Sequence, residues 1–153
     1  RKFLRQIYVS VDITAPLYWW KEFDTYKVGI VANSCSTMHK IHEKEFTIDD
    51  FSHEHLLTHA ESYNGYVSTS VLECVIGVLN EFRKLYLDTK NKAYWWQMIQ
   101  LLPSSYNQTR TVTMTYENIY TMRQQRRGHK LDEWRIDFFN WSDELPHLKE
   151  LFD

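Results

Sequence analysis

A strand that runs directly into a helix constrains this chain more than any other stretch. Residues 111–115 read Thr-Val-Thr-Met-Thr, an alternation of polar and apolar side chains that predicts a strand with one buried face. From Tyr116 onward, Ile119 and Met122 are spaced for one face of a helix. Gly128 suits the left-handed conformation in which many helices end. The sequence therefore predicts a strand–helix unit without a connecting loop.

Arg126 continues the apolar face of this helix, at a position where another hydrophobic residue is expected. Arginine stays charged, so a guanidinium on an apolar face needs an anionic or hydrogen-bonding partner. A phosphate or the carbonyl edge of a pyrimidine would suit this planar group. The neighbouring cations serve either a ligand or the helix dipole; they are Arg123, Arg127 and Lys130.

The other predicted elements combine a strand with long helices. Alternating side chains predict a strand over residues 2–13. Thr14 can cap the next helix and Ala15-Pro16 suits its first turn, so an aromatic helix is expected over residues 17–26. Apolar periodicity predicts further helices at residues 47–61, 70–88, 91–102 and 131–141. The fold class that follows is α+β, with a mainly antiparallel sheet flanked by long helices.

Two of these helices begin with the residues of a capping box, Thr47 to Asp50 and Ser70 to Glu73. An apolar stripe is expected along the second of them, made by Val71, Val75, Leu79, Phe82 and Leu85. Cys74 lies in the same helix and is expected to pack. The histidines near these segments are expected to be solvated or to cap helices rather than to bind zinc.

Composition excludes several classes of protein. The 153 residues are 43% hydrophobic, 16% aromatic and 25% charged, which is typical of one folded domain over residues 1–153. A net charge of −2 argues against a dedicated nucleic-acid-binding protein. Two cysteines without metal or redox spacing, no membrane-length apolar run and no secretory signal predict a cytoplasmic location. The aromatic load favours an oligomer.

Residues 28–39 begin like a buried strand and end in small polar side chains. The run from Asn33 to Thr37 either surrounds a small ligand with hydroxyls and amides or forms a turn or helix cap. The chain has only four glycines and no Gly-x-Gly-x-x-Gly turn, which excludes a Rossmann nucleotide site.

The stretch from Leu102-Pro103 through Thr115 and Arg126 to His129 resembles the C-terminal half of the flavin-dependent thymidylate synthases, the ThyX family. Arg126 matches the arginine that grips the pyrimidine nucleotide in that family. Upstream, Ala15-Pro16 matches the start of the family's first helix, and Asn33 and Ser36 match its serine segment. The resemblance spans residues 12–133.

The chain also departs from the family pattern. Thr25-Tyr26-Lys27 stands where the family has Arg-His-Arg, and Glu22 stands where it usually has glutamine. Met38 and Ile99 replace arginines that bind the nucleotide in the family. The resemblance is therefore to a divergent branch.

The resemblance implies an active site with specific residues. Arg126 and Ser36 would be catalytic. Substrate would contact Glu22, Ser34, Cys35, Ser36, Thr37 and Arg126. The cofactor would contact Thr25, Tyr26, Lys27, Asn33, Thr115, Thr121 and His129. No metal is expected.

The activity that the resemblance implies is reductive methylation of dUMP to dTMP. The carbon donor would be methylenetetrahydrofolate, the hydride carrier FAD, the reductant NADPH and the assembly a homotetramer. The guanidinium of Arg126 would stabilise negative charge on the pyrimidine. Two alternatives stay open: transfer of a hydroxymethyl or other one-carbon unit to a pyrimidine nucleotide, and a flavin- or nucleotide-binding protein without turnover.

Overall fold

The computed structural model describes residues 2–34 and 36–152. The chain divides into two compact units, one formed by Arg1–Ser34 with Thr109–Asp153 and the other by Cys35–Gln108. The fold is α+β, as the sequence predicts. Among the described residues, no helix has both the length and the apolar character needed to cross a membrane.

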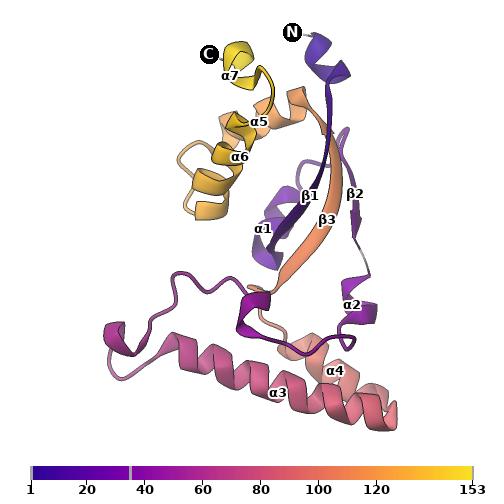
Figure 1. The fold of residues 1–153 in the computed structure, drawn as a ribbon, viewed down its shortest axis with the longest axis vertical. Coiled ribbons are helices and arrows are strands. Elements are labelled where there is room, and N and C mark those ends of the chain that lie inside the picture. Colours follow the sequence, from indigo (N-terminus) through magenta and orange to yellow (C-terminus); the bar gives the residue numbers. More distant parts are fainter. Residues whose placement is uncertain (1, 35, 153) are drawn as a thin grey trace. The chain divides into compact units, whose positions relative to one another are not determined.

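The first unit contains a three-stranded sheet in the order β1-β3-β2 (Figure 1). Its strands are β1 (Tyr8–Pro16), β2 (Val31–Ser34) and β3 (Asn107–Thr115). β2 pairs antiparallel with β3, with Val31 opposite Thr113. Hydroxyl contacts from Thr14 to Thr109 and from Ser10 to Thr113 run in opposite directions along β1 and β3, so this pair is antiparallel as well.

One face of this sheet carries helices and the other carries polar side chains. Figure 1 shows α1 (Leu17–Phe23), α5 (Tyr116–Arg126) and α6 (Phe139–Asp143) on the same side of the strands. The other helical segments of the unit are η1 (Lys2–Gln6), η4 (Glu133–Phe138) and α7 (Leu148–Phe152). Val112 and Met114 of β3 are fully buried in the core. Their polar neighbours Thr111 and Thr113 bond across to β1 instead.

Aromatic rings fill the core of the first unit. The indole of Trp134, which is fully buried, lies 4.7 Å from that of Trp19 and 5.1 Å from the ring of Phe138. Trp20 and Phe23 meet edge to face at 5.2 Å. Such ring pairs contribute about 0.5–1.5 kcal/mol each beyond area burial, so this cluster fixes α1 against η4.

The second unit is mainly helical. Its two longer helices, α3 (Ser68–Thr89) and α4 (Lys92–Leu101), lie side by side (Figure 1). Lys90 turns the chain between them in a left-handed conformation, and Asn91 caps α4 through the backbone N–H of Ala93. The shorter elements are α2 (Thr37–Lys40), η2 (Ile48–Asp50) and η3 (His59–Glu61). Its core includes Phe51, Leu79 and Met98.

The predicted helix over residues 47–61 is wrong. The capping box of Thr47 and Asp50 forms, but it begins only the short η2. Phe51 leaves this turn in an extended conformation and bridges to Tyr106, and its buried ring packs 5.5 Å from the tyrosine ring. Burial of Phe51 against a residue distant in sequence therefore overrides the local helix signal.

The phase and the first residue of α3 also differ from the prediction. The helix begins at Ser68, so Ser70 lies inside it and does not cap it. Its buried stripe is Leu72, Ile76 and Leu79, which leaves Val71 60% and Leu85 40% exposed. Cys74 is exposed rather than packed.

Three further expectations for the N-terminal part of the chain need correction. The strand begins at Tyr8, because residues 2–6 form the 3₁₀ helix η1. Thr14 does not cap α1: Pro16 holds the N-cap position, and the Thr14 hydroxyl contacts Thr109. The strand expected to be buried near residue 28 is the edge strand β2, whose side chains are all exposed.

Candidate functional site

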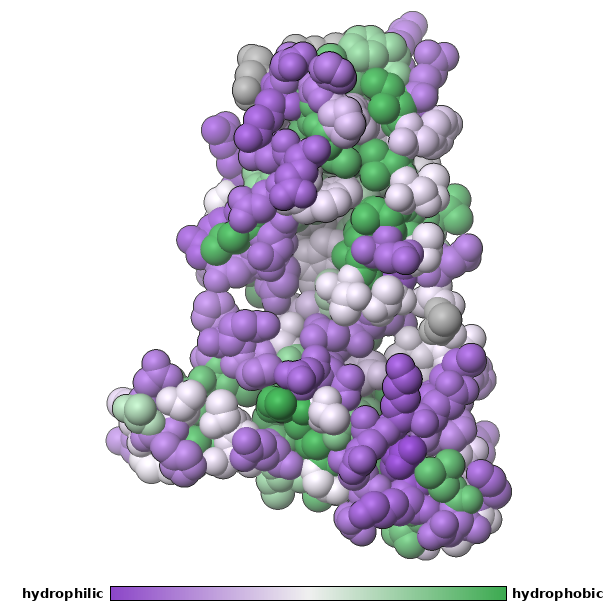
Figure 2. Space-filling view, in the orientation of Figure 1, coloured by the Kyte–Doolittle hydropathy of each residue, from purple (hydrophilic) through white to green (hydrophobic). Residues whose placement is uncertain are grey.

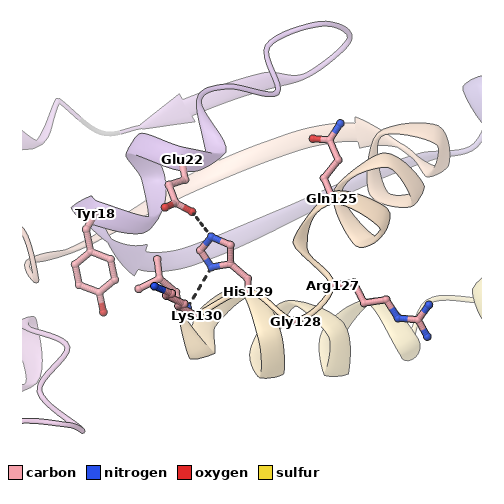
Figure 3. Close-up of a pocket in the computed structure, with 8 residues that line it drawn as sticks. Tyr18, Glu22, Gln125, Arg127, Gly128, His129 and Lys130 are labelled. Carbon is pink, nitrogen blue, oxygen red and sulfur yellow. Dashed lines mark hydrogen bonds and ion pairs between the residues drawn. The ribbon is translucent and has the colours of Figure 1, made fainter.

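A hollow in the first unit brings α1 together with the segment that follows α5. Its volume is about 730 Å³. The lining residues are Tyr18, Glu22, Gln125, Arg127, Gly128, His129, Lys130 and Leu131 (Figure 3). Among the described residues, no three His, Cys, Asp or Glu side chains are grouped to hold a metal ion.

Local sequence signals set the geometry of this hollow. Thr115 caps α5, and its partner in the capping box is Asn118, which also donates to the carbonyl of Val28 at 3.0 Å. Gly128 follows the helix with a φ of 71°, which glycine adopts at little cost. This turn brings His129 back toward α1, where it faces Glu22 (Figure 3).

Glu22, Arg126 and His129 form a charged cluster at one side of the hollow. Arg126 Nη1 donates to Glu22 Oε2 at 3.1 Å, and His129 Nε2 lies 3.3 Å from the same oxygen. The backbone N–H of Leu131 donates to His129 Nδ1 at 3.1 Å. Since Nδ1 accepts this bond, the proton of the neutral ring is on Nε2, which lies 3.3 Å from Glu22 Oε2 and 3.2 Å from Arg126 Nη1. One carboxylate oxygen thus receives two donors.

Arg126 points inward, as the sequence predicts, but its partners belong to the protein. Its guanidinium lies 4.9 Å from the ring of Trp134, and its Nε donates to the hydroxyl of Tyr26 at 2.9 Å. The side chain is 17% exposed, and Arg126 does not line the hollow. Glu22 thus supplies an anionic partner of the kind that the sequence requires for this arginine.

Arg123 is also more enclosed than its place on the tyrosine face implies. Its side chain is 18% exposed and pairs with Asp143 at 2.8 Å. It also bonds to the hydroxyl of Ser142 and lies 4.6 Å from the ring of Phe139. This arginine joins α5 to α6 and therefore has a structural role.

In the described part of the chain, two other cations near the hollow are not held by ion pairs of this kind. Arg127 and Lys130 line it and are exposed, and neither forms an ion pair within the part of the chain that the structure describes. Figure 3 shows the guanidinium of Arg127 directed away from Glu22 and His129. The hollow thus has a hydrogen-bond acceptor at one side and exposed positive charge elsewhere, an arrangement suited to a ligand with both an N–H donor and an anion.

Several of the sequence-predicted site residues come together here. Tyr26 and His129 join Arg126 and Glu22, and the Thr25 hydroxyl donates to the Glu22 carbonyl at 2.8 Å. Sequence reasoning did not select Tyr18, Gln125 or Leu131, which carry no charge signal. It left Arg127 and Lys130 open as cations that serve either a ligand or the helix dipole.

The remaining predicted residues lie elsewhere. Lys27 is exposed beyond α1, Asn33 and Ser34 lie on the exposed edge strand β2, and the hydroxyl of Thr121 bonds to the carbonyl of Glu117. Thr115 is 8% exposed, and its hydroxyl is engaged in the capping box.

The catalytic serine expected from the sequence belongs to the second unit. Ser36 occupies the N-cap position of α2, and Thr37 accepts a hydrogen bond from Gln108 at 2.7 Å. Cys35 lies outside the described residues.

The fold is that of the flavin-dependent thymidylate synthases. Two crystal structures of ThyX from Helicobacter pylori with FAD and dUMP each match with a TM-score of 0.62. Each match covers 95% of this chain and 70% of the other, at 13% sequence identity. No protein-family model matches the sequence. No curated protein matches it either. The structural likeness confirms the resemblance at the level of fold and defines a divergent ThyX-like protein.

Proposed function

We propose that this protein binds FAD and a pyrimidine nucleotide and transfers a one-carbon unit to the nucleotide. The family's form of this reaction is reductive methylation of dUMP to dTMP, with methylenetetrahydrofolate as carbon donor and NADPH as reductant. The observation that carries the proposal is the ThyX fold over 95% of the chain, shared with a synthase crystallised with FAD and dUMP. The proposed location is the cytoplasm.

The charges of the first unit are compatible with both ligands, because FAD and a nucleotide each carry phosphate. Lys27, Arg127 and Lys130 are exposed cations without an ion pair among the described residues, so they can approach a pyrophosphate or phosphate. The FAD, when bound, supplies the hydride. The cofactor residues proposed from the resemblance are Thr25, Tyr26, Lys27, Asn33, Thr115, Thr121 and His129.

In this proposal Arg126 positions the carboxylate of Glu22 and also provides a positive electrostatic field. It holds the carboxylate of Glu22 at 3.1 Å and is itself fixed by Tyr26. Stacking on Trp134 limits its rotation, so the cluster is preorganised before a ligand arrives. The serine segment, with Ser34, Cys35, Ser36 and Thr37, is proposed to hold the nucleotide phosphate or base.

We also propose that the protein assembles as a homotetramer. Large hydrophobic side chains reach the surface among hydrophilic ones (Figure 2). Three of them, Val71, Val78 and Leu85, repeat every seven residues on α3, and each is at least 39% exposed. An apolar seam of this spacing favours packing against another helix. A second copy of the chain is the proposed occupant.

A second candidate, a ThyX-like protein that binds the ligands without turnover, is favoured by one observation. Glu22 neutralises much of the charge of Arg126, which weakens the electrostatic stabilisation that a developing anion needs. Transfer of another one-carbon unit keeps the same pocket and is tested together with methylation.

The test is release of tritium from C5 of labelled dUMP or dCMP by the full-length protein. Release that requires FAD, NADPH and methylenetetrahydrofolate together supports one-carbon transfer, and chromatography of the product names the group added. Binding of FAD and nucleotide without release would establish the non-catalytic candidate. Glu45→Gln, an exposed change in the second unit, provides a control with native turnover.

A further inference from the structure

The carboxylate of Glu22 has one occupied oxygen and one open oxygen. Oε2 receives Arg126 and His129, whereas Oε1 accepts no hydrogen bond from any residue that the structure describes. The Glu22 side chain is 34% exposed and lines the hollow. An ionised carboxylate is an acceptor only. Oε1 is therefore placed to receive an N–H donor from a ligand.

The histidine beside Glu22 leaves this acceptor character unchanged. His129 Nδ1 accepts the backbone N–H of Leu131, and its Nε2 lies 3.3 Å from Glu22 Oε2 and 3.2 Å from Arg126 Nη1. Neither ring nitrogen is left to donate to a ligand carbonyl. Gln125 also lines the hollow, but Figure 3 shows its amide on the far side from Glu22. Lys130 also lines the hollow, where it is exposed and carries its charge on a flexible stem.

The bases of pyrimidine nucleotides differ in the group that the acceptor oxygen of Glu22 would contact. Cytosine presents an N4 amino donor, whereas uracil presents the O4 acceptor at the same position, as thymine does. A carboxylate accepts a hydrogen bond from the amino group and repels the carbonyl oxygen. The N3–H of uracil is a single donor flanked by two carbonyl oxygens, so it offers the carboxylate less. An amino-bearing base therefore matches Oε1 better.

We infer that Glu22 selects a cytosine nucleotide over a uracil nucleotide in this hollow. The inference rests on the proposed function and narrows its substrate. Arg126 and His129 hold the carboxylate in place, Oε1 receives the N4 amino group, and the exposed cations Arg127 and Lys130 take the phosphate. The ring of Tyr18, which lines the same side of the hollow in Figure 3, offers a flat surface for the base.

Calorimetric titration of dCMP and dUMP into the FAD-saturated full-length protein tests the inference. Native protein is expected to bind dCMP about ten- to a hundredfold more tightly than dUMP, the range of discrimination for a well-placed polar contact to a base edge. Glu22→Gln is expected to reduce that ratio at least about tenfold, because an amide can also donate to O4. Glu45→Gln should leave the ratio unchanged, and circular dichroism verifies that both variants fold.

The outcomes separate the inference from the proposed function. Equal affinity, or tighter binding of dUMP by native protein, overturns the selection of cytosine and leaves pyrimidine binding intact. A native preference for dCMP that Glu22→Gln does not change also overturns it, since another residue would then read the base. Failure of both nucleotides to bind, with FAD bound, overturns the inference together with the nucleotide part of the proposed function.

Discussion

Replacement of Arg126 by alanine should destabilise the protein through two losses that the structure separates. The first is the ion pair with Glu22, whose side chain is 34% exposed while that of Arg126 is 17% exposed. The second is the packing of the guanidinium on Trp134 and its bond to Tyr26. The variants required are Arg126→Ala, Glu22→Ala, the double variant and Arg126→Lys.

The expected loss of folding free energy from breaking this ion pair lies between two known limits. Exposed ion pairs contribute about 0.2–1 kcal/mol, and loss of one partner from a buried pair costs about 3–5 kcal/mol. The partial burial of this pair places its loss near 2 kcal/mol, and loss of the cation–π contact adds about 1 kcal/mol. Arg126→Ala should therefore cost about 3 kcal/mol in total. Lysine should recover less than half, because it restores charge without the planar group.

Urea denaturation of each variant measures these values. The double variant should cost less than the sum of the single variants by about 1–2 kcal/mol, since the second substitution no longer strands a charge. Arg135→Ala is the matched control: its side chain is 53% exposed, it pairs with Asp132 three residues earlier, and its loss should cost under about 1 kcal/mol. Additive losses at Glu22 and Arg126 would show that the two side chains are not coupled, and a loss at Arg126 as small as that of the control would show that its contacts contribute little to folding stability.

Four other outcomes follow from the structure. Trp134→Ala should cost about 3–5 kcal/mol and change the tryptophan fluorescence, because the fully buried ring contacts Trp19 and Phe138. Asn118→Ala should cost about 1–2 kcal/mol in urea denaturation, because it removes the capping-box partner of Thr115. Burial, and then the charge of Asp50, raise the pKa of Tyr106. The contribution of this tyrosine to folding stability should therefore be complete below the ordinary tyrosine pKa of about 10 and be lost as pH rises through the pKa of the folded state. Tyr106→Phe should reduce this loss of stability at high pH. Light scattering should give a mass near four times 18.6 kDa, and a monomer mass would contradict the tetramer.

The sequence predicts the strand–helix unit well because its signals are local. Alternation in β3, the caps of α5 and the glycine after it each act within a few residues. The partner of Arg126 was not predictable in this way, because Glu22 lies 104 residues earlier in the chain. The sequence showed that the arginine needed a partner, and only the packing of α1 against η4 supplies it.

The predictions of a helix over residues 47–61 and of the buried stripe on α3 are wrong for a related reason. The capping box at Thr47 is a valid start signal, but the burial of Phe51 beside Tyr106 contributes more than continuation of the helix. On α3, apolar residues occur on more than one face, so periodicity alone does not choose the buried stripe. Contact with α4 buries Leu72, Ile76 and Leu79 instead of the stripe that begins at Val71. Tertiary packing therefore decides what local pattern leaves open.

The most direct test of the account is calorimetric titration of FAD into the assembled full-length protein, followed by a pyrimidine nucleotide. We expect FAD to bind, the protein to become yellow, and the nucleotide then to bind the FAD-loaded protein. Lys27→Ala should weaken the first step, since it removes an exposed cation next to α1. A correctly folded oligomer that takes up neither FAD nor nucleotide would contradict the proposal that this ThyX fold retains the ligands of the synthase.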